Sequence, residues 1–138
     1  MPRLPAARLG DKVTGTDIHM VIPPPPSPPT PQPMPFPYQA TLTGGCCPTV
    51  RIGGKPAATL STTATISPPH VPPGPMAFAP QVPPPTNTGT VMKGSASVRI
   101  GGKPAARVGD TVQTCSFPAP APNGRIMPPV PQHGVSIG

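Results

Sequence analysis

One nine-residue sequence occurs twice in this chain of 138 residues, and it constrains the fold more than any other feature. Residues 50–58 read V-R-I-G-G-K-P-A-A, and residues 98–106 repeat all nine letters. A third, truncated copy opens the chain, because residues 3–11 (R-L-P-A-A-R-L-G-D) match residues 103–110 (K-P-A-A-R-V-G-D) with one residue inserted. A unit this small cannot bury a core alone, so the repeat predicts three similar units that pack against one another.

Prolines separate these units. Of the 30 prolines, 25 lie in blocks at residues 23–37, 68–85 and 118–131, each following one copy of the repeat. We therefore predict one domain over residues 1–138, built from modules at about 1–37, 38–85 and 86–138, with no separate effector domain. Composition alone gives an alternative, because 45 Pro and Gly residues with a net charge of +7 are typical of a disordered, basic, proline-rich adaptor protein.

Each complete repeat predicts a short β-hairpin. Apolar and basic residues alternate in V-R-I, Gly-Gly suits a tight turn with positive φ, and K-P-A-A forms the return strand. The first copy lacks the V-R-I-G-G limb, so that limb is missing or supplied by another segment. The middle copy continues as T-L-S-T-T-A from Thr59 and lacks the Gly-Asp of the other two, which weakens strict threefold equivalence. No stretch shows helical periodicity or the length of a membrane span, and the expected fold is small, irregular and all β.

Histidine and cysteine carry the site chemistry. His19 lies fourteen residues after Pro5, and His70 lies fourteen after Pro56, so the two histidines occupy equivalent positions. In the third module that position is Pro118, with a cysteine three residues before it. Equivalent side chains that point at a pseudo-threefold axis converge. Two imidazoles, one thiolate and a third imidazole, taken from His133 because a fourth ligand is needed, would give the closed tetrahedral set of structural zinc. The predicted ligands are His19, His70, Cys115 and His133. Solvent-exposed histidines are the alternative.

Cys46 and Cys47 align with Gly94 and Ser95 of the third module, which favours small turn residues over metal ligands. An adjacent pair rarely forms a comfortable disulfide, and three cysteines cannot all pair, so we predict no disulfide framework. A metal site that joins this pair to His19 and His70 is the alternative.

Two P-A-A-R tetrads with G-D two residues later, and one degenerate P-A-A-T, resemble the proline-alanine-alanine-arginine (PAAR) repeat family. The matching residues are Pro5, Ala6, Ala7, Arg8, Pro56, Ala57, Ala58, Pro104, Ala105, Ala106 and Arg107. Members of that family are small cones that cap the trimeric β-helical spike of contractile injection machines, chiefly the type VI secretion system and phage-tail-like particles. The family's cone holds zinc near its vertex with three His and one Cys, and the residues here that match are His19, His70, Cys115 and His133.

The resemblance implies a metal-stabilised cone of three pseudo-threefold hairpin modules with proline-rich loops. It implies a structural protein that sits as one tip per spike trimer, sharpens the spike and helps to pierce a target membrane, with effectors as further partners. The ligand set suits one Zn²⁺ and would also accept iron or nickel. Basic residues of the motifs are the expected spike contacts: Arg3, Arg8, Arg51, Lys55, Arg99, Lys103 and Arg107.

Other functions fit the residues less well. Asp11, Asp17 and Asp110 are the only carboxylate side chains, which leaves few groups for acid–base catalysis, so we predict no enzyme activity. Aromatic platforms for nucleic acid are missing, and most basic residues belong to the hairpins. The first motif begins at Arg3 without a preceding apolar segment. We therefore expect synthesis in the cytoplasm without a signal peptide, assembly at the spike tip, and delivery out of the cell on contraction.

Overall fold

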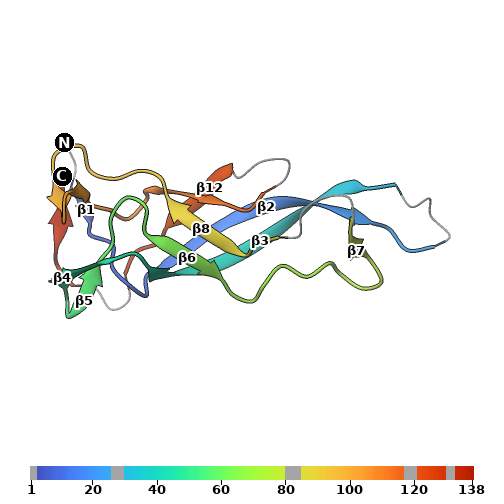
Figure 1. Ribbon diagram of the computed structural model, residues 1–138, viewed down its shortest axis with the longest axis horizontal. Coiled ribbons are helices and arrows are strands. Elements are labelled where there is room, and N and C mark those ends of the chain that lie inside the picture. Colours follow the sequence, from blue (N-terminus) through green and yellow to red (C-terminus); the bar gives the residue numbers. More distant parts are fainter. Residues whose placement is uncertain (1–2, 26–29, 80–84, 117–120, 130–132) are drawn as a thin grey trace.

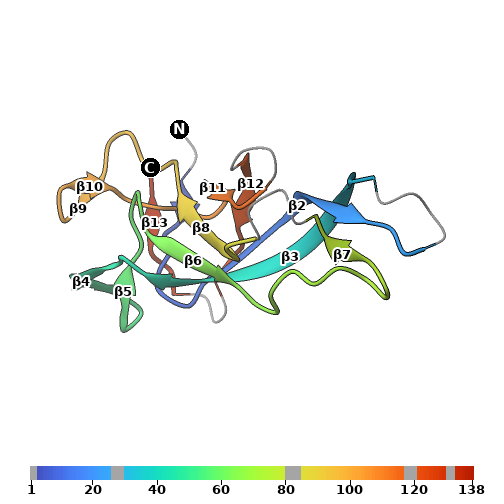
Figure 2. The ribbon, with the colours of Figure 1, turned by 45° about the vertical axis from the view of Figure 1, so that its right-hand side comes forward.

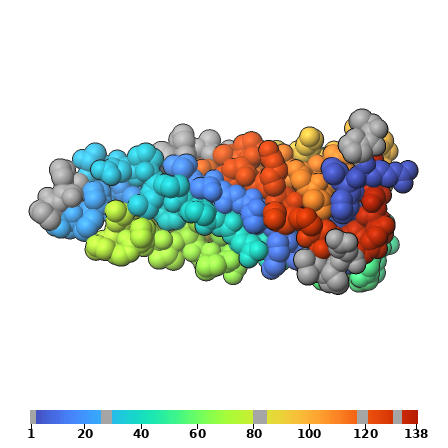
Figure 3. Space-filling model, turned by 180° about the vertical axis from the view of Figure 1, so that it is seen from behind, coloured from blue at the N-terminus to red at the C-terminus, as the bar shows by residue number. Residues whose placement is uncertain are grey.

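The computed structural model describes residues 3–25, 30–79, 85–116, 121–129 and 133–138, and every regular element among them is a β-strand. The strands are β1 (Leu4–Pro5), β2 (Lys12–Ile22), β3 (Gln32–Gly44), β4 (Cys47–Ile52), β5 (Lys55–Ala57), β6 (Thr63–Ile66), β7 (Ala77–Phe78), β8 (Thr88–Val91), β9 (Arg99–Ile100), β10 (Lys103–Pro104), β11 (Thr111–Thr114), β12 (Ala121–Ile126) and β13 (Ser136–Ile137). The molecule is elongated (Figure 3), with β1, β4 and β5 at one end and the C-terminal end of β2 and the start of β3 at the other (Figure 1). The prediction of an all-β fold is confirmed, and the folded structure argues against the disordered adaptor.

Six strands close into a small antiparallel barrel. Their order is β12-β11-β8-β6-β3-β2, and β12 pairs again with β2 to complete the circle. Apolar residues at alternate positions of these strands point inward, as the period of a strand requires. The largest apolar side chains that the barrel buries completely are Val13, Leu42, Ile66, Val91, Val112 and Ile126.

A long hairpin carries the sheet beyond the barrel towards the far end of the molecule (Figure 2). Strands β2 and β3 pair without a break from Lys12–Thr41 to Val21–Gln32. Prolines at residues 33, 35 and 37 of β3 alternate with side chains that face the interior, including the buried Phe36. Proline has no N–H to donate, yet the ladder between β2 and β3 is unbroken. The backbone nitrogens of all three prolines therefore face the edge of β3 that points away from β2. Strand β3 also crosses the module boundary predicted between residues 37 and 38.

Three copies of the P-A-A segment meet in a ring at the end of the molecule that holds β1, β4 and β5, which we call the wide end. The Ala7 amide donates to Ala106 O at 2.9 Å, the Ala106 amide to Ala58 O at 3.0 Å, and the Ala58 amide to Ala7 O at 3.0 Å. The hydrogen bonds therefore run in a closed cycle in which each copy donates to one neighbour and accepts from the other. All three alanines are fully buried, so a side chain larger than a methyl group has no room there.

The middle copy keeps the same turn with different residues. The Asp11 and Asp110 carboxylates accept the amide hydrogen of the residue three positions earlier, at 2.9 and 2.7 Å. In the middle module the Thr62 hydroxyl accepts the Thr59 amide hydrogen at 2.9 Å. Ser61 adopts a φ of +75° where the other copies have glycine. The threefold backbone pattern therefore survives the substitutions that made it doubtful from sequence.

Two of the three hairpins around the ring are the predicted ones. Strand β4 pairs with β5, and β9 pairs with β10, and both Gly-Gly turns have positive φ at each glycine. In the third hairpin β1 pairs with β13, so that Leu4 lies opposite Ile137. The V-S-I-G sequence of residues 135–138 therefore supplies the limb that the first copy lacks, and it closes the chain into a circle of three hairpins.

Candidate metal centre

Four side chains with metal-binding groups converge inside the molecule, where β2 leaves the barrel. Asp17, His19, His70 and Cys115 each offer one ligand atom, and these atoms all lie within 4.8 Å of one another. Asp17 and His19 belong to β2, His70 follows β6, and Cys115 directly follows β11. The cluster thus joins one strand or strand extension from each of the three predicted modules.

Strand alternation brings the first two of these residues together. Side chains at odd positions of β2 point inward, so Val13, Asp17, His19 and Val21 are all buried. His19 is 4% exposed and Asp17 is fully buried. A buried carboxylate beside two imidazoles and a thiol needs compensating partners, because burial penalises the charged form strongly.

Asp17 has those partners on both carboxylate oxygens. Oδ1 accepts hydrogen bonds from the Thr114 hydroxyl and, at 2.7 Å, from Asn123 Nδ2. Oδ2 lies 2.8 Å from His70 Nε2 and 3.6 Å from Cys115 Sγ. One oxygen therefore anchors the carboxylate to the barrel wall, and the other faces the cluster.

Two of the ligand-atom separations match those of a tetrahedral ion. With bonds of about 2.0 to 2.3 Å, ligand atoms of a zinc site lie about 3.3 to 3.8 Å apart. Cys115 Sγ is 3.7 Å from His19 Nε2 and 3.6 Å from Asp17 Oδ2. The Asp17–His70 contact, at 2.8 Å, is shorter because it is a hydrogen bond. The donor set of two imidazoles, one thiol and one carboxylate could hold one metal ion.

Burial sets the protonation of the cluster. Desolvation lowers the pKa of His19, and the nearby His70 lowers it further. Desolvation raises the pKa of the Cys115 thiol. At neutral pH the imidazole of His19 is therefore free of the second proton that would block metal binding, whereas Cys115 must lose a proton to become a ligand.

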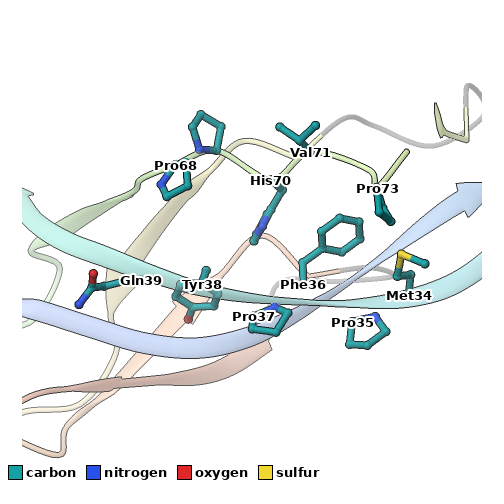
Figure 4. A pocket seen from close by; sticks show the side chains of 11 residues that line it. Met34, Pro35, Phe36, Pro37, Tyr38, Gln39, Pro68, His70, Val71 and Pro73 are labelled. Carbon is teal, nitrogen blue, oxygen red and sulfur yellow. The ribbon is translucent and has the colours of Figure 1, made fainter. Parts of the chain in front are cut away.

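Aromatic rings surround the histidines. Phe36 and Phe78 lie edge-on to His19, with ring centroids 5.6 and 6.0 Å away, and Tyr38 lies 5.9 Å from His70. Desolvation raises the pKa of Tyr38 to about 12. An apolar groove of about 560 Å³ runs along β3, and His70 points from its far wall towards β3 between the labelled Phe36 and Tyr38 (Figure 4). These rings limit water around the two imidazoles.

The third copy of the repeat lies in a segment that matches a known protein family. Residues 83–135 match the PAAR motif family, and this segment contains the third copy of the repeat together with Cys115. The chain therefore carries a PAAR motif over residues 83–135. No curated protein matches the PAAR chain. Among the residues that the structure describes, no helix is long and apolar enough to cross a bilayer.

The fourth predicted ligand lies elsewhere in this PAAR protein. His133 Nε2 contacts the Ala6 carbonyl oxygen at 2.9 Å, and the Val135 amide donates to its Nδ1 at 3.0 Å. The ring therefore fastens the β1–β13 hairpin beside the alanine ring. The structure brings together His19, His70 and Cys115, and places Asp17, which the sequence analysis did not propose as a ligand, beside them. The signal that could have identified Asp17 is its position two residues before His19 on one face of a strand.

Both arginines of the PAAR tetrads also have internal partners. Arg8 is 2% exposed, and its Nη1 donates to Ile52 O and Gly53 O at 3.3 and 3.4 Å. Arg107 pairs with Asp110 at 3.1 Å and donates to Gly138 O at 3.4 Å. These two side chains hold neighbouring hairpins together and do not offer their charge to a partner. The other basic residues expected at the spike are exposed: Arg3, Arg51, Lys55, Arg99 and Lys103.

Proposed function

We propose that the protein is the tip of a contractile injection machine, where it caps the end of a trimeric β-helical spike. The observation that carries this proposal is the cyclic set of hydrogen bonds among Ala7, Ala58 and Ala106 at the wide end. A trimeric spike ends in three equivalent strand edges, which must be covered. One chain with three equivalent hairpins around a threefold ring offers one hairpin to each edge, and its unique segments extend away from the ring.

The exposed charges of the hairpins agree with such a contact. Arg51 donates to Gly54 O at 3.1 Å and Arg99 donates to Gly102 O at 3.2 Å, so the two basic side chains have the same conformation in equivalent hairpins. Ser136 stands at this position in the third hairpin. Isolated surface ion pairs contribute only ~0–1 kcal/mol each to stability. In this proposal the charges orient the two proteins, and shape complementarity and backbone pairing supply most of the binding free energy.

The cluster at Asp17 stiffens the tip in this proposal. Asp17, His19, His70 and Cys115 would hold one Zn²⁺ ion, which would supply a structural cross-link with no catalytic part. His19, His70 and Cys115 come from separate modules, and fixing them to one point joins the modules beyond the barrel. Metal binding of this kind contributes directly to folding free energy. A stiff, elongated body suits a protein that penetrates a target membrane under load, and no catalytic role is proposed.

The remaining assignments follow from the same proposal. The whole of residues 1–138 forms one structural domain, one copy binds each spike trimer, and effectors are further partners. The protein is made in the cytoplasm, assembles at the spike tip, and leaves the cell or enters a target when the machine contracts.

Co-purification with a trimeric spike protein of such a machine tests the proposal. We expect one copy of the chain per trimer. Reversing the exposed charges in Arg51→Glu/Arg99→Glu weakens the complex, whereas Val71→Asp, an exposed position away from the hairpins, leaves it unchanged. A wild-type chain that does not bind any spike trimer, or equal binding when the β4–β5 and β9–β10 turns are removed, contradicts the capping role.

A further inference from the structure

The three PAAR turns share one backbone pattern but differ in the side chain that follows P-A-A. In the first turn Arg8 crosses to the neighbouring hairpin and donates to Ile52 O and Gly53 O. In the third turn Arg107 crosses in the same direction to Gly138 O, which is the glycine of the equivalent V-x-I-G limb. Each arginine thus fills the space between its own turn and the next hairpin around the ring.

The middle turn has no side chain that reaches so far. Thr59 occupies the arginine position, and its hydroxyl donates to the adjacent Leu60 O at 3.3 Å. The limb that an arginine here would reach is Ile100–Gly101. A cavity of about 190 Å³ lies at this place, and its lining includes Cys46, Cys47, Thr59, Ile100, Gly101 and Lys103.

The surroundings of the equivalent Gly53 and Gly101 show that the cavity occupies the place that an arginine fills in the first turn. A Cβ added at Gly53 would lie 2.3 Å from Arg8 Nη1, so the guanidinium packs directly on that glycine. A Cβ added at the equivalent Gly101 would meet Cys47 Sγ first, at 3.1 Å. A thiol therefore borders the space on Gly101 where the first site holds a guanidinium.

We propose that this cavity receives an arginine side chain from a partner protein that docks on the wide end. The Ile100 and Gly101 carbonyls belong to the same hairpin position as the Ile52 and Gly53 carbonyls that bind Arg8. A guanidinium has five donors in a planar fork, which matches two neighbouring carbonyl oxygens better than an ammonium does. The inference concerns the cavity alone and does not depend on which protein docks there.

The charges around the cavity weaken the binding of an arginine there compared with the two internal sites. Asp11 and Asp110 neutralise the internal arginines, but Thr62 stands at the corresponding position in the middle turn. Lys103 adds a positive charge at the rim, whereas the Cys47 thiol offers a polarisable acceptor. An incoming arginine is therefore bound less tightly than Arg8, as a contact between separate proteins requires if it is to exchange.

Nuclear magnetic resonance titration of the wild-type chain tests the site directly. The probe is N-acetyl-arginine amide, and the matched control is N-acetyl-citrulline amide, which has the same length but no charge. We expect saturable shifts of the Cys46, Cys47 and Gly101 amide signals with the arginine probe, and at least tenfold weaker binding of the citrulline probe. Equal binding of the two probes, no saturation, or shifts confined to other regions overturns the proposal.

Two substitutions sharpen the result. Thr59→Arg supplies the missing side chain from the chain itself, and we expect it to raise the melting temperature by several degrees and to abolish the shifts. Thr59→Ala leaves the cavity open and retains probe binding. Shifts that persist unchanged in folded Thr59→Arg contradict the site, and the wild-type titration stands whether or not that variant folds. Neither measurement involves a spike, so its failure is distinguishable from failure of the capping role.

Discussion

The Thr62 hydroxyl stands 2.9 Å from the Thr59 amide and does for the middle turn what a carboxylate does for the other two. Both side chains are almost completely buried. A neutral acceptor suffices here because the neighbouring position carries no arginine that needs a counter-charge. In the middle turn, threonine thus stands at both the arginine and the aspartate positions, the turn is kept, and a cavity lies beside Thr59.

Replacing the hydroxyl tests this role. Thr62→Val keeps the shape but leaves the buried Thr59 amide without its acceptor, and we expect a loss of about 1–3 kcal/mol in the free energy of unfolding. Thr62→Ser retains the oxygen and remains close to wild type. Chemical denaturation measures both variants, and equal losses in the two would show that the hydroxyl is not the stabilising group.

Enlarging the alanine ring tests the threefold packing. Ala58→Val adds two methyl groups where three segments of the chain meet, and overpacking of this kind costs about 1–3 kcal/mol. Ala77→Val places the same change on an exposed strand position and serves as the control. Thermal unfolding should separate the two variants clearly, and a neutral effect of Ala58→Val would mean that the ring has unused space.

Closure of the first repeat depends on Ile137, which is 6% exposed and packs against Ala6, Ile52, Ala57 and Ala105. Ile137→Ala should lower stability by about 2–5 kcal/mol. The neighbouring Val135 is 42% exposed, and Val135→Ala should cost much less. Similar costs for the two substitutions, measured by denaturant unfolding, would indicate that β13 contributes little to the core.

Metal content distinguishes the ligands predicted from the repeat from those that the structure groups together. We expect one metal ion per wild-type chain by elemental analysis, and loss of most of it in His19→Ala, His70→Ala, Cys115→Ala and Asp17→Asn. His133→Ala should retain the metal, because this ring lies in the β1–β13 hairpin. Loss of metal from His133→Ala, with retention in folded Asp17→Asn, would restore the ligand set inferred from sequence.

Proton release on metal binding follows from burial. The raised pKa of Cys115 keeps the thiol protonated at pH 7, so zinc binding should release at least one proton. Calorimetry in buffers of different ionisation enthalpy measures this number, and Cys115→Ser should release fewer protons. Zinc affinity should rise with pH as the thiol ionises, and a pH-independent affinity would exclude the thiol as a ligand.

Acid should also destabilise the metal-free chain. The pKa of His19 in the folded chain lies below its ordinary 6.5, chiefly because the ring is desolvated. As the pH falls through 6.5, the unfolded chain takes up a proton at His19 before the folded chain does, so the free energy of unfolding decreases. His19→Phe should reduce this dependence, and an unchanged pH profile in that folded variant would locate the effect in other groups.

The extent of sequence prediction can be judged from particular residues. The Gly-Gly hairpins were predictable because positive φ at two consecutive residues is almost specific to glycine. The convergence of His19 and His70 was predictable because both keep the same distance from the motif. His133 does not lie fourteen residues after the proline of its own copy, and it was predicted only because a fourth ligand was needed. Its contacts with Ala6 and Val135 depend on how the chain closes, which the sequence pattern does not specify.

Other features depend on tertiary contacts that local patterns do not encode. The barrel forms because β12 returns to pair with β2, and no local pattern specifies this pairing. The burial of Arg8 and Arg107 was missed because a basic residue in a short motif is usually exposed, and only the neighbouring hairpin provides the carbonyl groups that accept it. Residues 135–138 read V-S-I-G, which resembles the V-R-I-G limb of the other hairpins. A match of four small or aliphatic residues is too weak to identify this limb unless the first hairpin is already known to lack one.

The pairing of β1 with β13 has a consequence for any polypeptide joined to this fold. Both strands lie at the wide end, so a segment that continues from either side of the domain begins there and not at the narrow end (Figure 1). In the proposed capping role, cargo attached by fusion would therefore begin beside the spike. The C-terminal end of β2 and the start of β3 lie at the opposite end of the molecule, far from both β1 and β13 (Figure 1).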